Sequence, residues 1–247
     1  MLDSPRACAG LRINHHYFRN TLLRTLPDED RQRLLPHLER IELRRRGGAQ
    51  FPSNTLNHVY FIEDGLVSVL ADTGKAKSIE TRMIGPEGFI GIRVALGKRE
   101  GFHRRVVQVA GSAMRVDADV FAALLDDSKA LHQVMLDYVH TVILQGSQLS
   151  ACNANHAIPQ RLARWILMAH DRCGTDELTV TQKMLSRVLG VRRATISECL
   201  AAMEPDGILE RSRSIIRIAD RDRLEALACR CYAMIGGSLK LARCGTR

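Results

Sequence analysis

The stretch Leu178-Thr-Val-Thr-Gln-Lys-Met-Leu-Ser-Arg-Val-Leu-Gly-Val-Arg-Arg-Ala-Thr-Ile-Ser-Glu-Cys-Leu-Ala-Ala-Met203 decides the fold of the last third of the chain. Thr181 suits the cap of a first helix, and Gly190 suits the left-handed turn that ends it. Apolar residues fall on one face before Gly190 and on one face after it. They are Met184, Leu185, Val188, Leu189, Ile196, Cys199, Leu200 and Met203. This pattern predicts a helix-turn-helix.

The second helix of the motif presents polar side chains in its first turns, where a recognition helix meets the major groove. Arginine fits the O6 and N7 atoms of guanine, and hydroxyl groups reach bases or phosphates. The predicted DNA-binding residues of the two helices are Thr181, Gln182, Arg192, Arg193, Thr195 and Ser197. The sequence therefore predicts that this segment binds double-stranded DNA.

A pair of short β-runs follows the motif. Ile208-Leu-Glu-Arg-Ser-Arg-Ser-Ile-Ile-Arg-Ile218 predicts two strands with a basic tip, which is typical of a wing, and Arg211 and Arg213 are expected near the DNA backbone. The alternative is a helical hairpin in a larger core with solvated arginines. The turn, the basic first turn and the hairpin occur together, which favours DNA binding.

Upstream, residues from about Asp119 to His156 have the pattern of one long helix. Apolar positions alternate in steps of four and three over more than three heptads, which predicts a seam between two copies of the chain. The predicted dimer residues are Leu131, Met135, Tyr138, Val142, Gln145 and Leu149, with Cys152 and His156 continuing the stripe. The alternative is a helix that lies on its own barrel. Asn153 to Pro159 ends the helix and marks the expected domain boundary.

Residues 50–121 contain short β-rich runs between turn signals, a spacing typical of an antiparallel barrel of jelly-roll type. The turn signals are Glu63-Asp-Gly65, Asp72-Thr-Gly74, Gly85-Pro-Glu-Gly88, Gly97-Lys98 and Ala110-Gly-Ser112. Residues 13–45 are predicted to be helical, with breaks at Pro27 and Pro36. The chain is thus expected to be an α+β protein with a β-barrel sensor domain (13–121), a long dimerisation helix (122–157) and a winged helix-turn-helix (158–235).

The composition fits a globular protein in contact with a polyanion. Of 247 residues, 45% are hydrophobic, and no apolar run is long enough to span a bilayer. We expect a cytoplasmic protein without a secretory signal. The net charge is +9, and residues 159–247 hold 16 Lys and Arg against 10 Asp and Glu. Seven cysteines without a C-x-x-C motif predict no metal site. Cys229 and Cys231, two residues apart, are expected on different helix faces.

The order of barrel, long helix and winged helix-turn-helix resembles the Crp/Fnr family of bacterial transcription regulators over about residues 20–235. The specific stretches are Gln160-Arg-Leu-Ala-Arg-Trp-Ile-Leu167, Leu178-Thr-Val-Thr-Gln182, Leu189-Gly-Val-Arg-Arg-Ala-Thr-Ile196 and Gly85-Pro-Glu-Gly-Phe-Ile-Gly91. The resemblance implies a homodimer on a two-fold symmetric operator, a cyclic-nucleotide-binding-like sensor domain, and RNA polymerase as a further partner.

The chain departs from the cyclic-nucleotide binders of this family. Their Gly-Glu pair is Gly91-Ile92 here, and their Arg-Ser-Ala is Arg104-Arg105-Val106. Isoleucine cannot accept a hydroxyl proton, and an unpaired buried hydroxyl costs roughly 1–3 kcal/mol. We therefore expect no gating by cyclic AMP. Gly91, Arg104 and Arg105 form a candidate pocket for another anion, or the two arginines are solvated. The recognition helix reads Arg193-Ala-Thr-Ile-Ser-Glu198, so the operator should also differ.

Other functions fit the residues less well. The first 150 residues contain only Cys8, whereas the oxygen-sensing branch of the family carries an N-terminal cysteine cluster. His15, His16, His58 and His103 are conceivable haem ligands, and a cupin-like metalloenzyme would need a clustered His-x-His that is absent. We expect no cofactor, no metal and no enzyme activity. The leading function is a sequence-specific dimeric transcription regulator, and the alternative is a small-molecule receptor with ligand-gated DNA binding.

Overall fold

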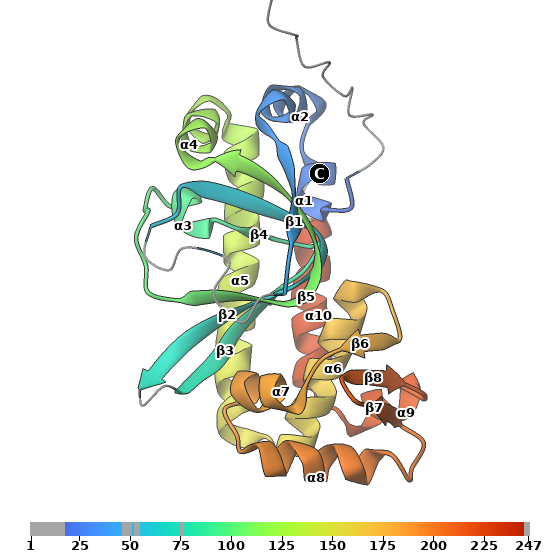
Figure 1. Ribbon diagram of the computed structural model, residues 1–247. Helices are drawn as coiled ribbons and strands as arrows, with labels where there is room; N and C mark the ends of the chain where they lie inside the picture. The colour runs from blue at the N-terminus through green and yellow to red at the C-terminus, as the bar shows by residue number, and fades with distance from the viewer. Residues whose placement is uncertain (1–17, 46–50, 52–54, 75–76, 245–247) are drawn as a thin grey trace, which may run out of the picture.

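Figure 1 shows the computed structural model, which describes residues 18–45, 51, 55–74 and 77–244. A sheet region (residues 18–127) lies above a C-terminal region (residues 158–244), and one long helix runs between them along one side. The predicted α+β class, with an antiparallel sheet domain and a C-terminal helix-turn-helix, is confirmed. No helix in the described part of the chain is long and apolar enough to cross a membrane.

The sheet region is built on one antiparallel sheet of order β1-β5-β2-β3, with β4 paired to β2. Its strands are β1 (Glu39–Leu43), β2 (His58–Gly74), β3 (Lys77–Ile84), β4 (Phe89–Ile90) and β5 (Arg104–Asp117). Successive residues of a strand point to opposite faces. In β2, Val59 and Phe61 therefore enter one core cluster, while Tyr60 and Ile62 enter another. Burial on both faces explains why this segment is apolar without alternation.

Two of the predicted turns are bends within long strands. Residues 63–65 lie inside β2 and residues 110–112 lie inside β5, and the register shifts where the two segments face each other. Gly65 has φ +84°, and a Cβ on Gly111 would lie 2.1 Å from the carbonyl oxygen of Asp64. The glycines therefore permit a close approach of two bulged backbones rather than a reversal of the chain.

The N-terminal prediction of helix is right for part of its range. The breaks at Pro27 and Pro36 are confirmed, and residues 13–17 lie outside the described residues. The elements are α1 (Thr21–Thr25), α2 (Asp28–Leu34) and the 3-10 turn η1 (Leu35–His37). Residues 39–43 form strand β1 instead of helix, because Ile41 and Leu43, two apart, pack into the core of the sheet while the backbone pairs with β5.

The predicted long helix is divided in two. After the short α3 (Ile92–Ala95), the chain forms α4 (Ala118–Asp127) and then α5 (Lys129–Asn155). Ser128 separates them with an extended backbone, and its hydroxyl accepts a 3.1 Å hydrogen bond from the N–H of Leu131. Serine is a preferred N-cap residue, so Ser128 marks the start of a new helix. The apolar periodicity alone does not reveal this boundary.

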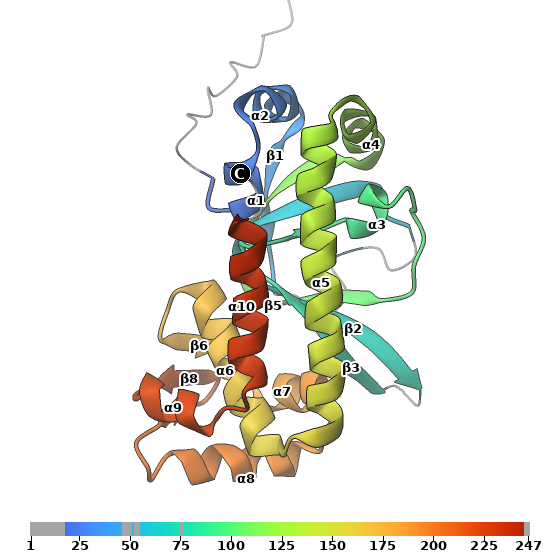
Figure 2. The same ribbon diagram turned by 180° about the vertical axis from the view of Figure 1, so that it is seen from behind.

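The C-terminal region begins directly after α5. Its elements are α6 (Ile158–Cys173), β6 (Glu177–Thr179), α7 (Gln182–Leu189), α8 (Arg193–Met203), β7 (Leu209–Ser212), β8 (Ile215–Ile218), α9 (Arg221–Leu227) and α10 (Cys231–Cys244). Helix α10 returns beside α5, as Figure 2 shows from behind. The last helix therefore ties the C-terminal region to the long helix.

Buried polar contacts join the two regions. Trp165 of α6 donates through Nε1 to Glu80 Oε1 of β3 over 3.0 Å, and the hydroxyl of Ser68 donates to the other oxygen of that carboxyl group. Nearby, Arg172 Nε of α6 donates to Glu87 Oε1 over 2.7 Å in an ion pair that is almost completely buried. Around them, one apolar cluster takes side chains from both regions. These contacts fix the C-terminal region on the sheet.

Glu80 should make stability depend on pH. Burial raises the pKa of Glu80 from 4.5 to about 7. Between these two pH values, the carboxyl group is protonated in the folded protein and ionised in the unfolded chain. Its stabilising contribution is complete below about pH 4.5 and is lost as the pH rises to about 7. Glu80→Gln cannot ionise; its carbonyl oxygen can still accept from Trp165, and its amide group can donate to the hydroxyl oxygen of Ser68. We expect its free energy of unfolding to match wild type at pH 4.5 and to exceed it by about 3 kcal/mol at pH 8.

Urea denaturation at the two pH values measures this difference. Glu177→Gln, at an exposed position of β6, is the matched control and should show no pH-dependent gain. An equal effect of pH on wild type and Glu80→Gln would show that Glu80 is not the titrating group.

Candidate DNA-binding interface

The helix-turn-helix has the predicted geometry. Thr181 Oγ1 caps α7 by accepting a 3.2 Å hydrogen bond from the N–H of Met184. Gly190 ends α7 with φ +69°, a conformation that glycine adopts without strain. The buried residues of the motif are Leu185, Val188, Leu189, Ile196, Leu200 and Met203. The two helices therefore share one core, and the opposite faces remain available.

The start of α8 is exposed and basic. Arg192 caps the helix with an extended backbone, Arg193 is its first residue, and both side chains are exposed. Thr195 and Ser197, in the following turn of α8, are half-buried. Arg193 Nε donates to Gln182 Oε1 of α7 over 3.3 Å, so two predicted DNA-binding residues are in contact. The first turn of α8 holds no acidic residue, which leaves the positive end of the helix dipole open to phosphate.

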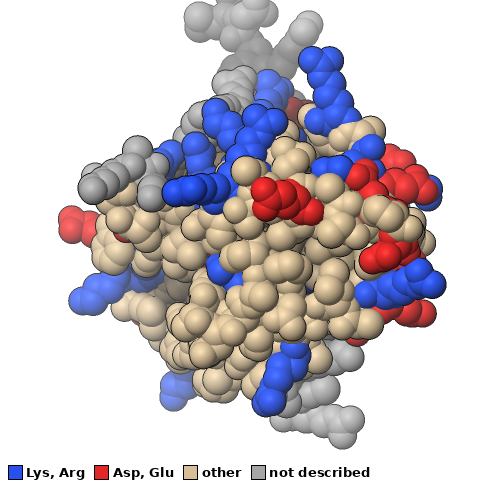
Figure 3. Space-filling model, turned by 90° about the horizontal axis from the view of Figure 1, so that it is seen from below, with Lys and Arg blue, Asp and Glu red and all other residues tan. Residues whose placement is uncertain are grey.

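Helix α8 lies at the end of the molecule farthest from α2 (Figure 1). Figure 3 looks onto this end: Lys and Arg gather over one part of the face, while most of the visible Asp and Glu gather along another edge. Strand β3 of the sheet region packs beside α7 near this end. The charge distribution favours a polyanion on the basic part of the face.

The wing is present, but its two arginines differ. Strands β6, β8 and β7 form a three-stranded antiparallel sheet, and Arg213 is exposed at the tip between β7 and β8. Arg211 lies on β7, and its guanidinium group pairs with the carboxylate of Glu204 just after α8. Arg213 is therefore the wing residue whose charge faces solvent, and Arg211 is engaged within the protein.

Arg213→Ala should change the salt dependence of DNA binding. A cation that neutralises one phosphate adds about 0.9 to the magnitude of the slope of log K against log salt concentration. We expect Arg213→Ala to lower this magnitude by about 0.9 for each bound wing and to leave sequence preference unchanged. Arg211→Ala, the matched control, should leave the slope as it is because Glu204 already pairs with Arg211. Fluorescence anisotropy over a salt series measures the slopes; an unchanged slope in Arg213→Ala would remove the wing from the interface.

The structure does not bring Arg104 and Arg105 into one pocket. As neighbours on β5 they point to opposite faces, so Arg104 is exposed and Arg105 is buried. Gly91 caps the start of α3 with φ +139°, and a Cβ there would lie 2.8 Å from the side chain of Val59. Arg104 and Arg105 therefore do not face one common cavity, and Gly91 lies where a larger residue would clash with Val59.

Arg105 instead shares its surroundings with another buried arginine that the sequence reasoning missed. Arg82 of β3 and Arg105 of β5 both pair in register with Val69 of β2, so the three side chains stand on one face of the sheet. Burial, together with the charges of Arg93 and Arg82, lowers the pKa of Arg105 to about 10. The Nε and Nη1 atoms of Arg82 are buried without a hydrogen-bond partner. The interior of the sheet region thus concentrates positive charge.

The predicted seam of α5 faces the inside of its own chain. Leu131, Met135, Tyr138, Gln145 and Leu149 are each at most 5% exposed, and Val142 is half-buried. They pack against the sheet region and the C-terminal region. The stripe thus has the burial that the alternative interpretation, a helix lying on its own sheet, requires.

The opposite face of α5 is open. Moving two positions along a helix rotates the side chain by about 200°, and residues displaced in this way from the buried stripe are exposed. Exposed positions on this face include Gln133, His140, Ile143, Leu144, Ser147, Ala151 and Ala154. Ile143 is 60% exposed and Leu144 is 40% exposed, which is unusual for such large apolar side chains. This face, visible from behind in Figure 2, is the part of α5 that a second copy could cover.

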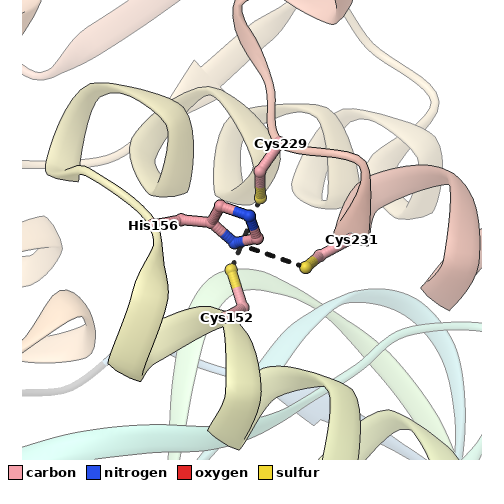
Figure 4. A group of neighbouring side chains, drawn as sticks. All are labelled: Cys152, His156, Cys229 and Cys231. Atoms are coloured by element: carbon pink, nitrogen blue, oxygen red, sulfur yellow. Dashed lines mark hydrogen bonds between the residues drawn. The ribbon is translucent and has the colours of Figure 1, made fainter.

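Three cysteines and a histidine meet at the end of α5, as Figure 4 shows. Cys152 and His156 are one turn apart at the end of α5, Cys229 lies in the connection after α9, and Cys231 opens α10. Their ligand atoms all lie within 4.8 Å of one another. The prediction that Cys229 and Cys231 point apart is wrong, because Cys229 precedes the helix and its backbone is free to turn inward. The thiols are free, and burial raises the pKa of Cys152 to about 12.

Comparisons with known proteins agree with this architecture. Residues 160–227 match the model of the Crp-like helix-turn-helix domain family. No curated protein sequence matches the chain.

Three solved structures share the fold. FixK2 from Bradyrhizobium japonicum is similar with TM-score 0.66 and 13% identity, covering 78% of this chain and 98% of that chain. The c-di-GMP responsive global regulator CLP from Xanthomonas campestris has TM-score 0.62 and 15% identity, covering 78% and 100%. TTHB099, a CRP family transcriptional regulator from Thermus thermophilus, has TM-score 0.62 and 18% identity, covering 76% and 96%. Residues 160–227 thus form a Crp-like helix-turn-helix domain, and the chain as a whole has the fold of the Crp/Fnr family transcription regulators.

Proposed function

We propose that the protein is a homodimeric, sequence-specific regulator of transcription that reads DNA through α8. The observation that carries this proposal is the pair of exposed arginines, Arg192 and Arg193, at the start of the second helix of a helix-turn-helix that Gly190 closes. A side chain in this position reaches base edges when the helix enters the major groove. The contact with Gln182 holds Arg193 toward the outer face of α7 and α8.

Two copies of α8 are needed to read a two-fold symmetric operator. The open face of α5 supports pairing through Ile143 and Leu144, and its small residues Ser147 and Ala151 allow close approach of a second helix. A symmetric dimer paired through α5 carries one α8 for each half-site. The operator should then be an inverted repeat whose half-sites are about one helical turn, roughly 10 base pairs, apart.

This function needs neither a cofactor nor catalytic residues; among the similar structures, TTHB099 is described as a transcriptional regulator and CLP as a global regulator. It places the protein in the cytoplasm, where a bacterial regulator meets DNA. RNA polymerase would be a partner when the bound dimer activates transcription.

Selection of binding sites from random duplexes tests the proposal. The purified protein should enrich an inverted repeat, and the variant Arg192→Ala, Arg193→Ala should enrich none. Enrichment of an asymmetric single site would contradict the symmetric dimer. Failure of wild type to retain any duplex, with and without metabolite extract, would contradict DNA binding itself.

One observation favours the second candidate function, a receptor whose DNA binding is gated by an anion. Arg82 and Arg105 stand on one face of the sheet with buried positive charge, and an anion between them would offset their repulsion. CLP, which shares the fold, is described as c-di-GMP responsive. Thermal shift with cyclic AMP, c-di-GMP and inorganic phosphate separates the cases. A gated receptor should be stabilised by one of them in wild type and not in Arg82→Ala, while no shift at all would leave the regulator ungated by these anions.

A further inference from the structure

We propose that Cys152, His156, Cys229 and Cys231 bind one Zn²⁺ ion with tetrahedral geometry. Three thiolates and one imidazole are an established ligand set for structural zinc. The four residues come from the end of α5, the connection after α9 and the start of α10. The site is independent of the proposed DNA-binding function, because none of its ligands lies on α7, α8 or the wing.

The distances between the ligand atoms suit a single ion. Cys152 Sγ lies 3.4 Å from Cys229 Sγ, and Cys231 Sγ lies 3.5 Å from His156 Nδ1. Zn–S bonds of about 2.3 Å and Zn–N bonds of about 2.0 Å at tetrahedral angles place sulfurs about 3.8 Å apart and sulfur and nitrogen about 3.5 Å apart. These two distances lie within about 0.4 Å of the tetrahedral values, and all four ligand atoms lie within 4.8 Å of one another.

The alternatives explain fewer of the four residues. A Cys152–Cys229 disulfide would leave Cys231 and His156 without a role, although their side chains are in contact. An iron–sulfur cluster spreads its ligands over several iron atoms, so their ligand atoms must stand farther apart than the 4.8 Å limit found here. A compact set rich in sulfur and containing one nitrogen fits a mononuclear Zn²⁺.

The surroundings complete the site. Gln148 Nε2 donates to Cys231 Sγ over 3.0 Å, an amide contact of the kind that orients a ligating thiolate. Arg161 and Arg164 of α6 are only 6% and 3% exposed, and the Nε atom of each is buried without a hydrogen-bond partner. Zn²⁺ with three thiolates carries one net negative charge. That charge would offset part of the positive charge of the two buried guanidinium groups, which repel each other.

The position of the site gives it a structural consequence. The ion would fasten α10 to α5 at the point where α5 gives way to α6. Arg161 also donates from Nη2 to the carbonyl oxygen of Leu189, over 2.8 Å, at the turn of the helix-turn-helix. Metal binding would therefore stabilise the joint that supports α7 and α8. Removal of the ion should lower the melting temperature of the whole chain.

Metal content and cobalt substitution test the proposal on the full-length protein, purified under reducing conditions. We expect close to one Zn²⁺ per chain by mass spectrometry. Replacement by Co²⁺ should give thiolate-to-metal charge transfer and the intense visible bands of tetrahedral cobalt. Cys229→Ser, Cys231→Ser should lose both signals. The matched control, Cys173→Ser, Cys199→Ser, removes two cysteines outside the cluster and should keep them.

Two further measurements keep the test decisive when the double variant fails to fold. His156→Ala leaves three thiolates and should weaken Co²⁺ binding and shift its visible bands. In wild type, chelation should expose Cys152, Cys229 and Cys231 to alkylation, and added Zn²⁺ should protect them again. Reduced wild type without zinc, an iron chromophore, a Cys152–Cys229 disulfide, or equal metal in both double variants would each overturn the assignment.

Discussion

Replacing Arg193 by alanine is expected to weaken binding to the selected operator by about 1–3 kcal/mol per half-site, roughly 5- to 150-fold, and to relax specificity at one base pair of each half-site. The side chain is exposed at the first position of α8 and is held by Gln182, so its guanidinium is oriented before DNA arrives. A bidentate pair with guanine is lost in the variant. Binding isotherms on the operator and on single-base substitutions of it measure both effects.

Two controls separate a base contact from simple charge. Arg193→Lys keeps the charge but loses the planar fork, so it should also relax specificity. Lys98→Ala removes an exposed charge near α3, far from α8, and should leave both affinity and specificity almost unchanged. A uniform loss of affinity across all sequences in Arg193→Ala would make Arg193 a phosphate contact instead.

Replacing Ile143 and Leu144 together by glutamate should convert the dimer to monomers. Both side chains are exposed on the open face of α5, and a pair of helices would bury them against their symmetry mates. Four carboxylates in that contact repel each other and lose their hydration. Because each monomer then reads only one half-site, we expect operator affinity to fall by on the order of 100-fold or more. Light scattering and binding isotherms measure the two consequences.

Phe102→Glu is the matched control for this pair. Phe102 is 79% exposed in the segment before β5, so the substitution adds one carboxylate per chain at an apolar position outside α5. The control should remain dimeric. If the Ile143, Leu144 variant stays dimeric, the contact between copies lies on another face. If wild type is already monomeric, the symmetric operator loses its basis.

The helix-turn-helix could be predicted from the sequence because its determinants are local. The Thr181 cap, the left-handed Gly190 and the two apolar faces act within 26 residues, and each has one dominant structural solution. The same holds for the wing strands. Ion pairs could not be predicted in the same way, because they depend on which elements meet in the fold. Glu204 pairs with Arg211 because the end of α8 lies beside β7.

The expectations from the sequence differ from the structure for one shared reason. A local pattern does not specify which distant element packs against it. The stripe of Leu131 to Leu149 has the spacing of a coiled coil, yet a helix packed on its own sheet buries the same positions. Bends at Gly65 and Gly111 resemble turns until the facing strand is known. Cys152 and Cys229 are 77 residues apart, so no spacing rule brings them together. The local indication of this cluster in the sequence is the pair Cys152 and His156, whose spacing of four residues places both side chains on one side of the helix end.

The most direct test of α8 as the reading element is dimethyl sulfate protection of guanine N7 on the selected operator, since N7 lies in the major groove. Wild type should protect one guanine in each half-site, the two separated by about one helical turn, and Arg193→Ala should leave both open to methylation. Binding with every guanine N7 unprotected, or protection unchanged in Arg193→Ala, would contradict the account.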